Sequence, residues 1–151
     1  MSHRPDPATL VWRDDTEGVD WHELEALYRA APLGTKRAED LRTVYGNSRY
    51  ACIVRDAEGR LAGAGRVLSD GLDCAYVCDV ALLPAWQGGG VGQALVQRLV
   101  DRCRGHRKII LYAVPGKEPF YRRFGFRRMR TAMAIFEHPA QAAQGGYIDA
   151  E

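Results

Sequence analysis

Hydrophobic residues change their spacing along the chain, and each change predicts a different kind of element. In the first third they recur at helical intervals, which predicts one helix beginning at Trp21 and a second over residues 37–45. Asp20 stands directly before the first helix and is expected to cap it. Short apolar runs separated by turn residues then predict three antiparallel strands, over residues 50–54, 60–68 and 74–83.

The second half of the chain alternates between helix and strand. After a run of glycines the helical spacing returns from Val91 to Cys103. A separate strand, ahead of the two N-terminal helices, is expected at residues 9–14. A strand over 108–114, a short helix over 118–124 and a last strand over 127–136 complete the series. This order predicts a mixed α/β fold in a single domain, residues 1–136, followed by a polar tail, residues 137–151.

Composition narrows the class of protein. The chain has 151 residues, of which 46% are hydrophobic, enough for one domain with a real core. A net charge of +2 gives no support for a nucleic-acid partner. No apolar run approaches the roughly 20 residues that span a bilayer, and the first residues do not resemble a signal peptide, so a cytoplasmic location without a membrane partner is expected. No Cys/His set completes a metal site around the four cysteines, which are expected to be reduced.

The most informative segment lies between the 74–83 run and the helix that begins at Val91. Consecutive glycines let the backbone approach a ligand, and a helix start offers free N–H groups, so the segment is suited to phosphate. A Walker A loop is excluded because Gly92 is followed by Gln93 and Ala94, and the three-glycine dinucleotide pattern does not fit either. The pattern Gln-x-x-Gly-x-Gly does fit, at Gln87, Gly90 and Gly92. A flexible loop at a helix start is the plain alternative.

A second motif, Phe-Tyr-Arg-Arg-Phe-Gly-Phe at residues 120–126, follows one strand later. Together the two motifs resemble the GCN5-related N-acetyltransferase (GNAT) superfamily, over about residues 50–130. The resemblance implies a mixed, mostly antiparallel sheet flanked by helices and splayed between its fourth and fifth strands, with acetyl-CoA in the gap. One departure is that residues 114–119 lack the asparagine that many family members place there.

The resemblance also implies which residues bind acetyl-CoA. Backbone groups of the fourth strand would pair with the pantetheine arm, at Val80, Ala81 and Leu82. The glycine loop and the start of its helix would hold the pyrophosphate, through Gln87, Gly88, Gly89, Gly90, Val91, Gly92 and Gln93. The 3′-phosphate would attract some of a basic cluster that is otherwise a solvated surface: Lys117, Arg122, Arg123, Arg127, Arg128 and Arg130.

The implied reaction is direct attack of a primary amine on the thioester of acetyl-CoA, with the amine most simply a small molecule. Tyr121 occupies the position of the family's general acid, although its ring could simply pack beside Phe120 and Phe124. Asp79 stands alone as a charge in an apolar strand, which suggests a base or an anchor for the substrate ammonium, or a satisfied structural carboxylate. Tyr76 is a fallback on the same strand.

The acceptor amine is expected between the first two helices, their connecting loop and the turn at residues 69–73. Aromatic and apolar candidates there suggest a small, partly apolar amine, although sequence does not separate them from core residues: Trp21, Tyr28, Leu33, Tyr45 and Asp70.

Other functions remain compatible with the sequence. They are a non-catalytic acyl-CoA-binding module of the same fold, an acetyltransferase for protein lysines or N-termini, and an interaction domain with a coincidental glycine loop. A homodimer is also left open.

Overall fold

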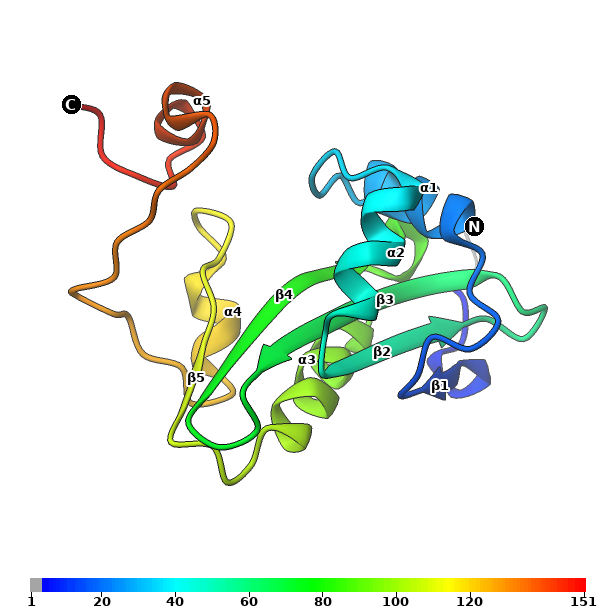
Figure 1. The fold of residues 1–151 in the computed structure, drawn as a ribbon. Helices are drawn as coiled ribbons and strands as arrows, with labels where there is room; N and C mark the ends of the chain where they lie inside the picture. The colour runs from blue at the N-terminus through cyan, green and yellow to red at the C-terminus, as the bar shows by residue number, and fades with distance from the viewer. Residues whose placement is uncertain (1–3) are drawn as a thin grey trace. The chain divides into compact units, whose positions relative to one another are not determined.

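The structure of this chain is a computed structural model that describes residues 4–151. Its central feature is one five-stranded sheet in the order β1-β2-β3-β4-β5 (Figure 1). The strands are β1 (Val11–Arg13), β2 (Tyr50–Arg55), β3 (Leu61–Ser69), β4 (Cys74–Leu82) and β5 (Lys108–Ile110). The chain divides into two compact units, Met1–Ile110 and Leu111–Glu151, and the whole sheet belongs to the first.

Sheet pairing is antiparallel from β1 to β4 and parallel between β4 and β5. The parallel ladder is short, because only Cys74–Tyr76 of β4 have partners in β5. Beyond Tyr76 this edge of β4 carries no further ladder to β5. The mixed, mostly antiparallel sheet that opens between its fourth and fifth strands is therefore confirmed.

Helices cover both faces of the sheet. α1 (Trp21–Ala30) and α2 (Ala38–Gly46) pack their buried side chains against Ala51, Ile53 and Ala64 on one face. Residues in a strand alternate between faces, so Gly65 points the other way, and there Leu99 of α3 (Val91–Arg102) lies against it. A Cβ on Gly65 would come within 2.7 Å of the Leu99 side chain, so a larger residue here would force Leu99 to shift.

Local signals account for the helix ends. Asp20 caps α1 as expected, since its Oδ1 accepts from the backbone N–H groups of His22 and Glu23 at 2.9 and 3.3 Å. The loop from α1 to α2 is tied down by Glu25, whose Oε1 accepts from Ala38 N at 3.0 Å. None of the helices among the described residues is long and apolar enough to cross a membrane.

The second unit, described by itself, contains α4 (Glu118–Arg122) and α5 (Pro139–Gln144). It has two aromatic clusters. Tyr112, Phe136 and Tyr147 meet with ring centroids 5.7–6.4 Å apart. Phe120 lies 5.0 Å from Tyr121 and 5.4 Å from Phe124.

Two expected strands need correction. The strand predicted at 127–136 does not form, because within residues 4–151 no other strand pairs with this segment. Its large apolar residues Met129, Met133 and Ile135 are exposed instead. The strand predicted at 108–114 is real but ends at Ile110, where its ladder to β4 ends. Part of the polar tail, residues 139–144, is helical.

Candidate active site

The glycine loop connects β4 to α3 through a 3₁₀ turn at Pro84–Trp86. Gly88 and Gly90 have φ angles of 77° and 88°, a region that side chains rarely adopt. Gly90 is the N-cap of α3, and among the described residues no side chain caps this helix. The first backbone N–H groups of α3 are therefore left for another hydrogen-bond acceptor, and the helix dipole favours an anion there.

Two polar side chains shape the loop. The Nε2 of Gln87 donates to the Leu82 carbonyl at 3.0 Å, which ties the loop to the end of β4. The Arg4 guanidinium lies next to Gly88, since a Cβ added to that glycine would stand 3.0 Å from Arg4 Nη2. The loop thus has a cation beside it. Val91, the first residue of α3, is buried.

The middle of β4 contains a β-bulge. Ala64 pairs with Ala81 and Arg66 pairs with Cys78, so the single residue Gly65 faces two residues, Asp79 and Val80. Asp79 has a φ of 54° and is the only non-glycine residue with positive φ within residues 4–151. This left-handed conformation is unfavourable for most side chains and is often found at functional sites.

The bulge directs the Asp79 carboxylate to two cations. Its Oδ2 accepts from Arg66 Nε at 2.8 Å, and its Oδ1 lies 3.3 Å from the Lys36 ammonium. The Asp79 and Arg66 side chains are 16% and 9% exposed, whereas Lys36, in the loop between α1 and α2, is 37% exposed. Hydrogen bonding and charge attraction from Asp79 outweigh desolvation and raise the pKa of Arg66. The three side chains carry a net charge of +1.

Two buried tyrosines, Tyr28 and Tyr45, form a hydrogen-bonded chain that ends on the backbone of the bulge. Tyr28 donates from its hydroxyl to the Asp79 carbonyl at 2.6 Å, and the Tyr45 hydroxyl is 2.5 Å from that of Tyr28. Because the single proton of Tyr28 goes to the carbonyl, Tyr45 must donate to Tyr28. Burial is the main cause that raises the pKa of both phenols, so both are protonated at neutral pH. They position Asp79 and are part of the core.

The other expected acceptor residues lie in two places. Trp21 packs on Tyr45 with ring centroids 6.1 Å apart, and Leu33 is partly buried against the same cluster. Asp70 is at the turn before β4, whereas Asp79 lies in the middle of that strand. Its Oδ1 accepts from the N–H groups of Leu72, Asp73 and Cys74, which lowers its pKa to about 2. Asp70 therefore organises its own turn.

Tyr121 belongs to the second unit. Its ring lies in α4 against Phe120 and, 6.2 Å away, Phe126. Burial raises the pKa of its phenol, so the hydroxyl carries its proton at neutral pH and is able to donate it. The six residues of the basic cluster are all exposed.

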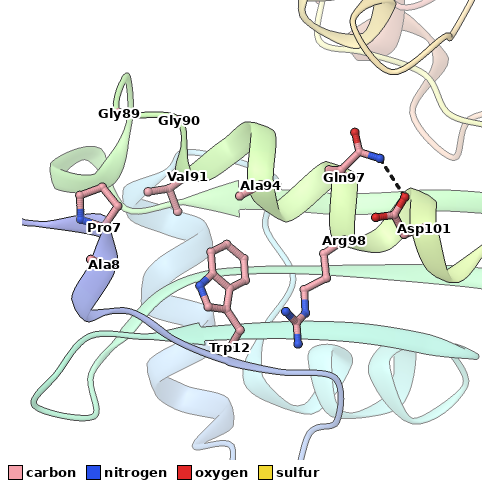
Figure 2. A pocket seen from close by; sticks show the side chains of 10 residues that line it. All are labelled: Pro7, Ala8, Trp12, Gly89, Gly90, Val91, Ala94, Gln97, Arg98 and Asp101. Carbon is pink, nitrogen blue, oxygen red and sulfur yellow. Dashed lines mark hydrogen bonds between the residues drawn. The ribbon is translucent and has the colours of Figure 1, made fainter.

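A hollow of about 670 Å³ lies on the flank of α3 that faces β1 (Figure 2). It borders the loop at Gly89 and Gly90, and the Trp12 ring lies across it from Val91. Asp79 does not line it. Its polar groups are already paired: Gln97 donates to Asp101, and Arg98 pairs with Asp14. This hollow is separate from the Asp79 cluster. No group of three metal-ligating side chains occurs among residues 4–151.

Sequence reasoning did not find three of these residues. Arg66 carried a usable signal, because it is a lone charge in an apolar strand that pairs with the strand of Asp79. Lys36 and Arg4 carried none, since each lies in an irregular segment whose path depends on tertiary contacts.

This chain is similar to known proteins in sequence and in fold. The model of the acetyltransferase (GNAT) family matches residues 19–126. Serotonin N-acetyltransferase 2, chloroplastic, of Oryza sativa subsp. japonica is 33% identical over 76% of this chain and 60% of its own length. The L-2,4-diaminobutyric acid acetyltransferase of Nocardia farcinica is 33% identical over 68% of this chain and 60% of its own length. The chain thus spans about three fifths of these two relatives.

Solved structures show the same fold. A candidate acetyltransferase of Deinococcus radiodurans R1 superposes with a TM-score of 0.80 at 24% identity, over 94% of this chain and 97% of that one. Glucosamine-6-phosphate N-acetyltransferase of Arabidopsis thaliana gives 0.63 at 18% identity, over 85% and 99%. The family match covers most of the chain, from α1 through the glycine loop to Phe126, and the chain therefore belongs to the acetyltransferase (GNAT) family.

Proposed function

We propose that this protein transfers the acetyl group of acetyl-CoA to a primary amine of a small molecule, by direct attack of the amine in a ternary complex. Family membership supports the acetyl donor. The acceptor class is supported by relatives whose names specify amines: serotonin, diaminobutyric acid and glucosamine 6-phosphate.

The cofactor would be held by backbone more than by side chains. The uncapped N–H groups at the start of α3 would bind the pyrophosphate, with the Arg4 guanidinium neutralising part of its charge. The pantetheine arm would run along β4 at Val80–Leu82, beyond the point where β5 stops pairing. Gln87 would contribute by fixing the loop to Leu82.

The observation that carries the amine assignment is the contact of Asp79 with an ammonium. Arg66, which is nearly buried, occupies one carboxylate oxygen of Asp79, and the second oxygen faces the more exposed Lys36. That oxygen lies 3.3 Å from the Lys36 ammonium, so the site accepts a primary amine in its charged form. The acceptor would take this position when Lys36 moves away.

Acetyl transfer then requires one proton transfer at the amine nitrogen and one at the thioester sulfur. The bound ammonium loses a proton to become a nucleophile, to water or to Asp79, and the departing sulfur needs a proton. Tyr121 would supply the second proton, since burial keeps its phenol protonated at neutral pH. Acetyl-CoA supplies the acetyl group.

A panel of primary amines with acetyl-CoA, followed by release of free coenzyme A, tests the proposal. We expect saturable release with one class of amine and none with the matched alcohols. Melting temperature with acetyl-CoA alone is the companion measurement, because ligand at 100 times its Kd adds about 2.7 kcal/mol. Stabilisation without release for any amine would identify a non-catalytic acyl-CoA-binding module. The absence of both stabilisation and release would contradict the cofactor assignment.

A further inference from the structure

Lysine is rare in this chain. Among 21 Lys and Arg residues only three are lysines, Lys36, Lys108 and Lys117. Lys108 pairs with Asp73 at the turn before β4, with Nζ 2.9 Å from Oδ2, and Lys117 is exposed in the second unit. Lys36 alone among them touches the carboxylate that the proposed function assigns to the acceptor amine.

The position of Lys36 follows from the loop that carries it. Residues 31–37 connect α1 to α2, and both ends are fixed: Leu33 N donates to the Tyr28 carbonyl at 2.7 Å, and Ala38 N donates to Glu25 at 3.0 Å. The loop thereby holds Lys36 over the bulge in β4. The Nζ of Lys36 is held by its ion pair with Asp79, and the side chain is more than a third exposed. The ammonium can therefore leave Asp79 and become hydrated by solvent.

We propose that Lys36 is an internal acceptor, which the enzyme acetylates on itself when acetyl-CoA is bound and no substrate amine is present. The inference rests on the proposed function, because it takes Asp79 Oδ1 as the place of the attacking nitrogen. Lys36 Nζ is a primary amine at that place and has the chemistry of the substrate.

The step balances as ordinary acetyl transfer. The Lys36 ammonium first loses one proton to solvent, and the neutral Nζ attacks the thioester carbonyl carbon. A C–N bond forms and the C–S bond breaks. The nitrogen loses a second proton, and coenzyme A leaves as its thiol. The product is an amide that has no positive charge, so it no longer pairs with Asp79 and leaves Oδ1 free for an external amine.

Peptide mass spectrometry after incubation with acetyl-CoA alone tests this. The purified full-length protein is sampled over time, and the acetyl group is quantified at all three lysines, with Lys108 and Lys117 reporting ordinary chemical acetylation. We expect Lys36 to be modified at least about tenfold faster than Lys108, because an intramolecular reaction has a high effective concentration. Its rate constant should not change with protein concentration, and a saturating substrate amine should suppress it.

Two variants complete the design. Lys36→Arg keeps the positive charge but removes the acceptor nitrogen, and the acetyl incorporated by the whole protein should fall to the amount found at Lys108 and Lys117. Lys108→Arg is the matched control and should leave the modification of Lys36 unchanged. Equal rates at Lys36 and Lys108, or a rate that rises with protein concentration, would overturn the inference. If amines turn over while Lys36 stays unmodified, only this inference fails. If neither is acetylated, the proposed function fails with it.

Discussion

Asparagine at position 79 would separate the electrostatic role of Asp79 from its backbone role. Asp79→Asn keeps the size and the acceptor oxygen of the side chain, and asparagine tolerates the left-handed conformation that φ 54° requires. What it removes is the charge facing Arg66, whose side chain is only 9% exposed.

The size of the effect follows from that contact. In Asp79→Asn the Arg66 guanidinium still donates to a side-chain oxygen, but the bond changes from one between two ions to one between an ion and a neutral group. Its contribution therefore falls toward the lower end of the about 1.5–3 kcal/mol typical of hydrogen bonds to charged groups. Leaving the Arg66 charge nearly buried without a counter-ion adds a further penalty, and we expect about 2–3 kcal/mol in total. The contact with Lys36 is more exposed and adds little. For a chain of this size the loss corresponds to a fall in Tm of about 4–12 °C.

Thermal unfolding of three variants provides the assay. Asp79→Ala should be less stable than Asp79→Asn by a further ~1–2 kcal/mol, because alanine is strained at positive φ. Asp101→Asn, at an exposed pair with Arg104, is the control and should change stability by less than about 1 kcal/mol. The reasoning is refuted if Asp79→Asn melts within about 1 °C of the wild type, or if the alanine and asparagine variants are equally stable.

Three further predictions concern the loop, the acid and the turn. Gly90→Val should raise the KM for acetyl-CoA. Gly59→Val is the control: it also has positive φ and open space around it, so it should have a similar strain of about 1–2 kcal/mol but an unchanged KM. If the two variants have the same KM for acetyl-CoA, the phosphates bind elsewhere. Tyr121→Phe should lower kcat by about 100-fold, the lower end for general acid catalysis, with the KM for acetyl-CoA nearly unchanged; a kcat within about twofold of the wild type would exclude the acid role. Asp70 has a pKa lowered from 3.8 to about 2, so its carboxylate stabilises the fold above pH 3.8 and this contribution disappears as the pH falls through 2. The free energies of unfolding of Asp70→Asn and wild type, measured in urea, should therefore differ at pH 5 and converge toward pH 2.

Sequence predicted the fold where the signal was local or carried by a motif. The helical spacing after Asp20 and the glycine loop before α3 both depend on nearby residues. The family that the glycine loop and the motif at residues 120–126 resembled is confirmed. The strand expected at 127–136 failed because a strand needs a hydrogen-bonded partner, and the residues of a segment do not show whether a partner strand lies beside it.

The candidate site was harder to predict for the same reason. Asp79 was conspicuous as a lone charge, but its direction depends on a one-residue offset between β3 and β4 that no local pattern encodes. Tyr28 and Tyr45 were expected to line the amine site, and the structure places their hydroxyls beneath the bulge, on the Asp79 carbonyl and on each other. Their roles as acceptor contacts, and that of Tyr121 as acid, stay predictions.

The most direct test of the account is the steady-state rate of coenzyme A release by wild type and Asp79→Asn, with acetyl-CoA saturating and a primary amine varied. If Asp79 Oδ1 holds the acceptor ammonium, the wild type should show amine-dependent, saturable release. The variant should lose about 10- to 100-fold in kcat/KM for the amine, the value of one charge-assisted hydrogen bond, while its KM for acetyl-CoA stays close to that of the wild type. Release that does not depend on the amine, or a folded Asp79→Asn enzyme with an unchanged kcat/KM, would contradict the account.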